Sequence, residues 1–147
     1  MNDWFMLESR IVERITTLVP ELRRVAAAMD LDGVMSQGQI VPACYIIYGG
    51  DEPVPGEPED GDALLDQYWL VVLAVRAGVR EESSSREAGL LLARIDAVLR
   101  GWRPLAAGVI EPFARSRSPA PLFEDGFGYF VLRYRARVTF ALEVIES

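Results

Sequence analysis

The side chains that could carry out chemistry in this sequence are carboxylates, arginines and tyrosines. The chain of 147 residues has no histidine, and all 15 of its basic residues are arginine. These absences exclude a histidine general base, a Ser-His or Cys-His pair, a Schiff-base or phosphate-loop lysine and a histidine-ligated zinc ion. Carboxylates alone could catalyse glycoside hydrolysis or bind Mg²⁺, but the positions of the carboxylates in this sequence favour neither function. We therefore predict no catalytic residue, no cofactor, no metal site and no enzymatic activity.

Acidic residues are concentrated in one segment between Gly49 and Gln67. The acids of this segment are Asp51, Glu52, Glu57, Glu59, Asp60, Asp62 and Asp66. The other 15 of the 22 acids balance the 15 arginines, so the segment accounts for the whole net charge of −7. Its prolines predict an extended, mobile loop over residues 49–66.

Three functions are open for this acidic loop: a divalent-cation site, a mimic of DNA, or a surface that repels DNA. The plain alternative is a solubilising loop without a ligand. Asp60-Gly61-Asp62 resembles part of a calcium loop, but the later bidentate glutamate of an EF-hand is missing. We therefore predict no metal ion there.

Arginines occur at alternate positions near the C-terminus. Within residues 127–146 the even positions from 130 to 144 are apolar, whereas Arg133, Arg135 and Arg137 occupy odd positions. A strand with this pattern buries one face and places the three guanidinium groups on the other, ~7 Å apart. They could bind an anionic partner, or they could pair with acids on neighbouring strands of a solvated face. The net negative charge disfavours nucleic acid, and arginine forks suit carboxylates of a partner protein.

We predict that these two charged groups form a partner or ring interface. The candidate interface residues are Asp51, Glu52, Glu57, Glu59, Asp60, Asp62, Arg133, Arg135 and Arg137. Trp4, near the N-terminus, is a further candidate for a contact between subunits.

Hydrophobic periodicity predicts the elements that position these groups. The expected elements are a helix over residues 4–29 that bends or restarts at Pro20, strands over 39–48, 67–77 and 109–114, a helix over 84–102, and a long strand over 127–146. Residues 115–126 are expected to form a second mobile loop. This order predicts an α+β fold with a mostly antiparallel (mixed) sheet of about four strands and with helices packed on one face.

The second helix is predicted to end abruptly at Leu99-Arg100-Gly101-Trp102-Arg103-Pro104. Gly101 suits the left-handed residue after a helix, and Pro104 prevents the helix from resuming. We expect Trp69, Trp102 and the single Cys44 in the core. The final strand would reach roughly 50 Å, so we expect it to bend or to extend past the body.

The length is that of one ordinary domain, and we predict a single domain over residues 1–147. No apolar run approaches the ~20 residues of a membrane helix, and the N-terminus lacks the layout of a signal peptide. We therefore predict a protein that is made in the cytoplasm and has no membrane partner.

Taken in order, several segments resemble the tail terminator (tail completion) proteins of tailed bacteriophages, particularly the Mu-like phage tail protein family. The segments that carry the resemblance are 10–15, 19–25, 41–43, 68–72, 88–91, 99–104 and 129–134. The pattern Leu-x-Gly-Trp-x-Pro after an Ala-Gly-rich helix is the most distinctive piece. All of these segments are packing motifs without a chemical signature.

The resemblance implies a structural protein of the phage tail or neck, assembled in the host cytoplasm. Such a protein caps the tail tube, ends its polymerisation and joins the tail to a head-completion or connector protein. The resemblance also implies an α+β subunit in a hexameric ring, through which DNA passes without specific binding, and no small-molecule substrate. On this hypothesis the acidic loop faces the DNA channel or contacts the tube.

A second hypothesis is a monomeric acidic binding module of the inhibitor or immunity type. Its acidic loop would occupy a basic site on a partner protein, and binding would be stoichiometric and sensitive to salt. A carboxylate-based enzyme is the third hypothesis.

Overall fold

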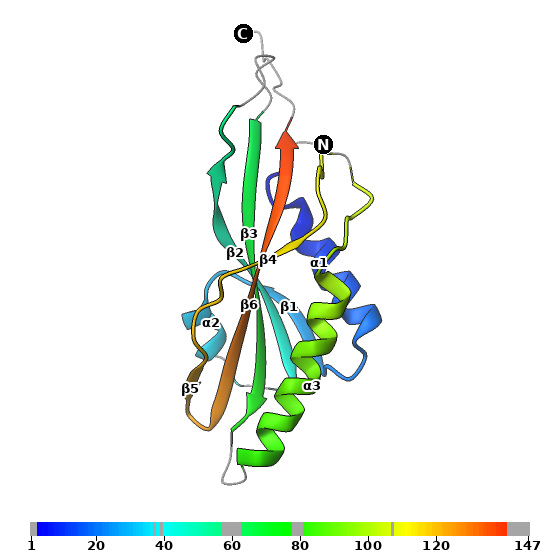
Figure 1. The fold of residues 1–147 in the computed structure, drawn as a ribbon. Coiled ribbons are helices and arrows are strands. Elements are labelled where there is room, and N and C mark those ends of the chain that lie inside the picture. The colour runs from blue at the N-terminus through cyan, green and yellow to red at the C-terminus, as the bar shows by residue number, and fades with distance from the viewer. Residues whose placement is uncertain are drawn as a thin grey trace.

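The structure is a computed structural model whose described residues form three helices around one mixed sheet (Figure 1). It describes residues 3–36, 38, 40–56, 63–77, 81–106 and 108–140, with the backbone alone for 81–84. The elements are α1 (Met6–Leu18), β1 (Arg24–Ala28), α2 (Leu31–Met35), β2 (Ala43–Pro53), β3 (Ala63–Arg76), α3 (Glu81–Leu99), β4 (Ala114–Ser116), β5 (Leu122–Glu124) and β6 (Phe127–Phe140).

The six strands form one sheet in the order β1-β2-β3-β6-β4, and β5 also pairs with β6. β1 runs parallel to β2, whereas the other pairs are antiparallel. β3 and β6 have 14 residues each and pair over their whole lengths. The predicted α+β class and mostly antiparallel mixed sheet are confirmed. The expectation of about four strands is wrong, because β1 and the three-residue β5 carry no recognisable alternation.

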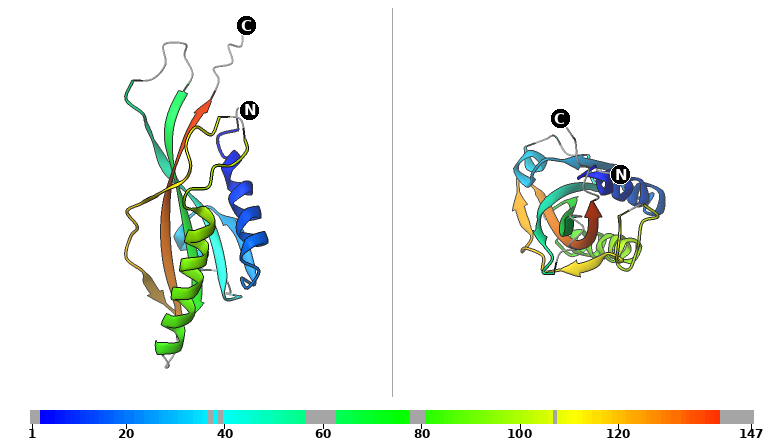
Figure 2. Two further views of the ribbon diagram at one scale, coloured as in Figure 1. Left: turned by 45° about the vertical axis from the view of Figure 1, so that its right-hand side comes forward. Right: turned by 90° about the horizontal axis from the view of Figure 1, so that it is seen from above.

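Helices lie on both sides of the sheet (Figure 2), and their side chains contribute to a core on each face. One core contains Ile11 of α1, Ile95 of α3 and Trp69 of β3. A second, smaller core contains Val34 of α2 and Tyr45 of β2. The prediction that the helices pack on one face is therefore wrong for α2. This helix has only five residues, too few to show a helical period in the sequence.

The N-terminal segment folds as one helix followed by a strand. The predicted helix is confirmed from Met6 to Leu18, where residues at helical spacing are buried. The predicted second helical piece after Pro20 is wrong, because residues 24–28 form β1 beside β2. The backbone N–H of Arg23 donates to the carbonyl of Pro42 at 2.8 Å just before this pairing begins. Pairing with a distant strand thus overrides the helix propensity of three consecutive alanines.

Both expected loops are shorter than predicted. The prediction of a loop over 49–66 is wrong at both ends, because residues 49–53 belong to β2 and residues 63–66 belong to β3. The loop over 115–126 contains most of β4 and all of β5. Asp125 and Gly126, with φ values of 52° and 80°, form a tight two-residue turn into β6.

The final strand confirms the predicted alternation over residues 132–140. Even positions are buried there, whereas odd positions are partly exposed. Earlier in β6, Tyr129 and Val131 are buried on the other face, in the core that includes Val34 of α2. The upper ends of β3 and β6 rise above α1 and α3 (Figure 1), and residues 141–146 of the predicted strand lie outside the described residues.

The end of α3 behaves as its sequence predicts. Gly101 has a φ of +77°, and the N–H of Trp102 donates to the carbonyl of Leu99 at 3.0 Å. Trp102 is half-buried and lies 5.2 Å from the ring of Phe113.

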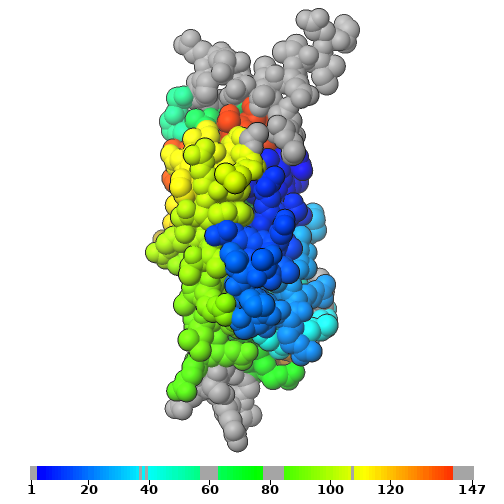
Figure 3. Space-filling view, turned by 90° about the vertical axis from the view of Figure 1, so that its right-hand side faces the viewer, coloured from blue at the N-terminus to red at the C-terminus, as the bar shows by residue number. Residues whose placement is uncertain are grey.

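Cys44 and Trp69 are fully buried, as predicted. Figure 3 shows α1 and α3 side by side on one surface of the molecule. No helix among the described residues is long and apolar enough to cross a membrane.

Candidate functional site

The register of β3 and β6 brings acids and arginines together on one face of the sheet. Asp66 lies opposite Arg137, and Tyr68 lies opposite Arg135. Glu52 of β2 lies on the other side of Asp66. We name this group, with the neighbouring Glu111, the charged strip. Its members are Glu52, Asp66, Tyr68, Glu111, Arg133, Arg135 and Arg137.

Arg137 makes the most complete contact in the charged strip. Its Nε donates to Oδ1 of Asp66 at 2.8 Å, and its Nη2 donates to Oδ2 at 3.1 Å. Hydrogen bonding to Asp66 raises the pKa of Arg137, so the guanidinium stays charged. The side chains of Arg137 and Asp66 are only 25% and 14% exposed. A two-pronged pair this sheltered stabilises a fold more than an isolated surface ion pair does.

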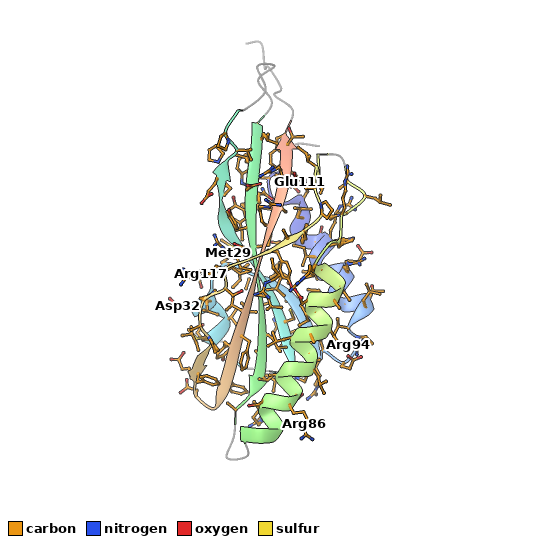
Figure 4. The ribbon with its side chains drawn as sticks, in the orientation of Figure 1. Met29, Asp32, Arg86, Arg94, Glu111 and Arg117 are labelled. Carbon is orange, nitrogen blue, oxygen red and sulfur yellow. The ribbon has the colours of Figure 1, made fainter. Side chains whose placement is uncertain are left out.

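Glu111 connects two arginines of the charged strip. Its carboxylate accepts from Nη2 of Arg135 at 3.1 Å and from Nη1 of Arg137 at 3.3 Å. The segment that carries Glu111 is held along β6, because the N–H of Ile110 donates to the carbonyl of Arg137 at 3.0 Å. Figure 4 shows Glu111 near the upper end of β6. Nε of Arg135 is buried and has no hydrogen-bond partner among the described residues.

Arg133 lies over an aromatic ring and makes no carboxylate contact among the described residues. Its guanidinium carbon is 4.0 Å from the ring centroid of Tyr68, the geometry of a cation–π interaction. The hydroxyl of Tyr68 donates to Oε2 of Glu52 at 3.5 Å. Burial, followed by the charges of Glu52 and Asp66, raises the pKa of Tyr68. Tyr68 thus connects the acidic and the basic parts of the charged strip.

Asp51 belongs to a separate network near the turn end of the β2–β3 hairpin. It accepts a hydrogen bond from the hydroxyl of Tyr48, which itself accepts from Nε1 of Trp4 at 3.1 Å. Burial and the hydrogen bond to Asp51 raise the pKa of Tyr48 to about 12. The ring of Trp4 also stacks on Phe140 at 5.0 Å. This network holds the N-terminal segment against the hairpin.

The structure places five of the nine predicted interface residues. Arg133, Arg135 and Arg137 share one face, as predicted, and Glu52 joins them through Tyr68, whereas Asp51 lies in the Trp4 network. Glu57, Glu59, Asp60 and Asp62 lie outside the described residues. In the charged strip Arg137 pairs with Asp66 of the neighbouring strand, which fits the interpretation as a face with cross-strand acids. Glu111, the partner of Arg135, lies outside the strands, and Arg133 lies over Tyr68. The role of these residues in an interface stays a prediction.

Sequence reasoning missed Glu111, Tyr68 and Asp66 as partners of the arginines. Asp66 falls within the expected acidic loop, one residue before the predicted strand over 67–77, whereas β3 begins at Ala63. Extending the predicted strand back by one residue places Asp66 and Tyr68, two positions apart, on one face. Glu111 lies in the strand predicted over 109–114, and that prediction is wrong, because this segment forms only an isolated bridge at Val109 and the first residue of β4. No pattern in the sequence indicates that Glu111 meets Arg135 and Arg137.

Comparison with known proteins identifies the family of this chain. The sequence model of the phage tail terminator protein family matches residues 1–143. The chain belongs to this family. No curated protein matches the sequence. A tail terminator is a structural protein of the virion, and this family member has that role.

A solved structure shows the same fold. It is a chain of a structure described as "Virion of native gene transfer agent (GTA) particle", with a TM-score of 0.58 and 17% sequence identity. The match covers 91% of this tail terminator and 95% of that chain. At this identity the likeness concerns the fold alone.

The charged strip of this tail terminator has the chemistry of a structural feature. Arg135 and Arg137 are bound to the carboxylates of Asp66 and Glu111, and Arg133 lies over the ring of Tyr68. The described residues contain no group of three or more His, Cys, Asp or Glu that could hold a metal ion. The strip ties the end of β6 to β3 and to the segment around Glu111.

Proposed function

We propose that this chain caps the phage tail tube as a closed ring, ends tube polymerisation and joins the tail to a head-completion protein. The observation that carries the proposal is the match of the tail terminator family over residues 1–143. A fold shared with a chain of a virion particle supports an assembled role. A ring of identical subunits needs head-to-tail contacts that close on themselves. We propose a hexamer, located between tail and head.

We propose that the β2–β3 hairpin is the part of the subunit that faces the tube or the DNA path. β2 and β3 rise above α1 and α3 at this end of the molecule (Figure 1). Asp51 and Glu52 lie in β2, and four more acids of the sequence stand between the two strands. Negative charge repels phosphates, so DNA would pass without binding. Arg135 and Arg137 do not offset this charge, because they already pair with Glu111 and Asp66.

The test combines the purified chain with the tail tube subunits of the same phage. We expect light scattering to show a closed oligomer, and electron microscopy to show tubes of uniform length with a ring at one end. Tubes that keep growing with bare ends, together with a chain that stays monomeric, would overturn the proposal. Stoichiometric binding of that monomer to a basic protein would instead support the acidic binding module.

A second experiment uses the double variant Asp51→Asn/Glu52→Gln. If the hairpin contacts the tube, this variant caps tubes less well. If the hairpin lines the DNA path, capping is unchanged and the ring gains affinity for DNA, which a salt-dependent gel shift measures.

A further inference from the structure

One edge of the sheet, formed by β1, is open along its outer side. β1 pairs only with residues 43–47 of β2 and has no second partner strand among the described residues. The strand carries small side chains, Ala26, Ala27 and Ala28, and is followed by Met29, which is 92% exposed. An open edge with small side chains lets the backbone of another strand approach closely.

The upper part of β2 is also an edge, but it carries the features that block strand addition. The pairing of β2 with β3 is interrupted between Tyr48 and Asp51, and Gly50 has a φ of +94°. Asp51, Glu52 and Pro53 follow on the same edge. Bulges, charges and prolines are the usual protection of edge strands. Within residues 24–28, β1 has no proline, its pairing with β2 shows no register shift, and its one charge is Arg24 at the first position.

The opposite edge of the sheet is formed at its lower end by β5. β5 pairs only with residues 127–129 of β6, on the side away from β3. Leu122 and Phe123 are 42% and 64% exposed, and the ring of Phe123 touches that of Phe130 at 5.9 Å. β5 is thus a short apolar strand whose outer side has no partner among the described residues.

The charges at the two open edges are complementary. Arg23 and Arg24 stand at the beginning of β1 and are exposed, and neither forms an ion pair within the described part of the chain. Glu124 and Asp125 stand at the end of β5 and are exposed. They too form no ion pair with any described residue.

We propose that β5 of one copy pairs antiparallel with β1 of a second copy. The pairing that puts Arg24 opposite Asp125 also puts Ala27 opposite Leu122. Phe123 then lies against the small side chain of Ala26, with no acid opposite an acid. The contact is head-to-tail, because each copy offers a different strand on each side. Repeated around a ring it leaves no open β1 or β5 edge. This inference rests on the proposed ring and names the surface that closes it.

Cysteine cross-linking tests the pairing directly. In an antiparallel pair, opposite Cα atoms lie ~4.5–5.5 Å apart, which a disulfide can span. The native Cys44 is buried and does not compete. We expect oxidised Ala27→Cys/Leu122→Cys protein to give a series of covalent oligomers on a non-reducing gel, and each single variant to stay monomeric on that gel.

The possible outcomes separate this inference from the proposed function. Covalent dimers from Ala27→Cys alone would mean that β1 pairs with β1, which overturns the head-to-tail contact. If the wild type forms a ring but the double variant gives no cross-links, the β1–β5 pairing is overturned and the proposed ring is not. A wild-type chain that is monomeric even with tube subunits would overturn both.

Charge reversal supplies a second test that needs no exact register. Arg23→Glu/Arg24→Glu, or Glu124→Arg/Asp125→Arg, should raise the concentration needed for assembly by about tenfold or more, because like charges then meet. Combining both reversals in one chain should restore assembly. The matched control is Arg86→Glu/Glu87→Arg on α3, and Figure 4 shows Arg86 away from Met29. Unchanged assembly in both edge variants would overturn the proposal.

Discussion

In the charged strip three arginines contact acids or a tyrosine of their own chain, whereas the arginines of β1 and the acids of β5 form no ion pair among the described residues. Both regions contain opposite charges on strands of the sheet or directly beside them. The difference is whether the chain folds those charges onto one another. Arg133, Arg135 and Arg137 are candidate interface residues in the sequence, and in the structure each of them contacts a side chain of its own chain.

The charged groups of the two regions contribute to different processes: those of the strip to folding, and those of the edges to assembly. The charged strip is sheltered, with Asp66 only 14% exposed, and its contacts hold β6 to β3. The open edges keep their charges in water, where they add little to the stability of a monomer. Changes in the charged strip should therefore alter the free energy of unfolding, and changes at the edges should alter self-association.

The largest effect is expected for Asp66→Ala in the charged strip. The substitution leaves the sheltered guanidinium of Arg137 without its two-pronged partner and should lower the free energy of unfolding by about 2–3 kcal/mol. Urea unfolding measures the loss. Glu87→Ala on the exposed side of α3 is the matched control, with a change within about 0.5 kcal/mol. Equal losses in the two variants would contradict the structural role of the strip.

Glu111→Gln should have a smaller effect on stability. It removes the negative charge that faces Arg135 and Arg137, but it keeps one acceptor oxygen, so we expect a loss of about 1 kcal/mol. The loss should shrink at high salt, because salt screens partly exposed ion pairs. Thermal unfolding at low and high salt checks this, and a loss that is independent of salt would contradict an electrostatic origin.

Tyr48→Phe should change the pH dependence of stability. The folded chain holds the Tyr48 proton more tightly than the unfolded chain, because the pKa is raised to about 12. The stabilisation is therefore complete below pH ~10 and is lost as the pH rises toward 12. Between pH ~10 and 12, the free energy of unfolding should fall less steeply with rising pH for Tyr48→Phe than for the wild type. Identical slopes would contradict the network of Tyr48 with Asp51.

Arg24→Ala should have the smallest effect on the monomer. The side chain is exposed and makes only a distant contact with the ring of Tyr45, at 5.8 Å, so the free energy of unfolding should change by less than about 0.5 kcal/mol. Its self-association should nevertheless weaken. Dilution series followed by light scattering measure that shift. If Arg24→Ala assembles as well as the wild type but has a lower free energy of unfolding, the edge residue acts in folding and not in assembly, which contradicts the account.

Much of the fold was predictable because its signals are local. The alternation of β6 fixes the face of each arginine, and Gly101 marks the end of α3. β1 was not predictable in this way. Leu22 and Val25 fit helical spacing as well as a strand, and the choice depends on pairing with Cys44 and its neighbours.

The site was predictable only in part, because its contacts join residues far apart in the chain. Asp66 and Arg137 are separated by 71 positions. The alternation shows that both point to one face, but the register that sets them opposite each other comes from the full pairing of β3 with β6. The positions of the open edges also follow from strand order, which the sequence does not display.

Sedimentation velocity of three proteins tests the central claim most directly: the wild type, Asp66→Asn in the charged strip, and Arg23→Glu/Arg24→Glu at the edge. We predict that the wild type and Asp66→Asn sediment as the same closed oligomer, and that the edge variant sediments as a folded monomer. A monomeric Asp66→Asn beside an edge variant that still forms the ring would contradict the account.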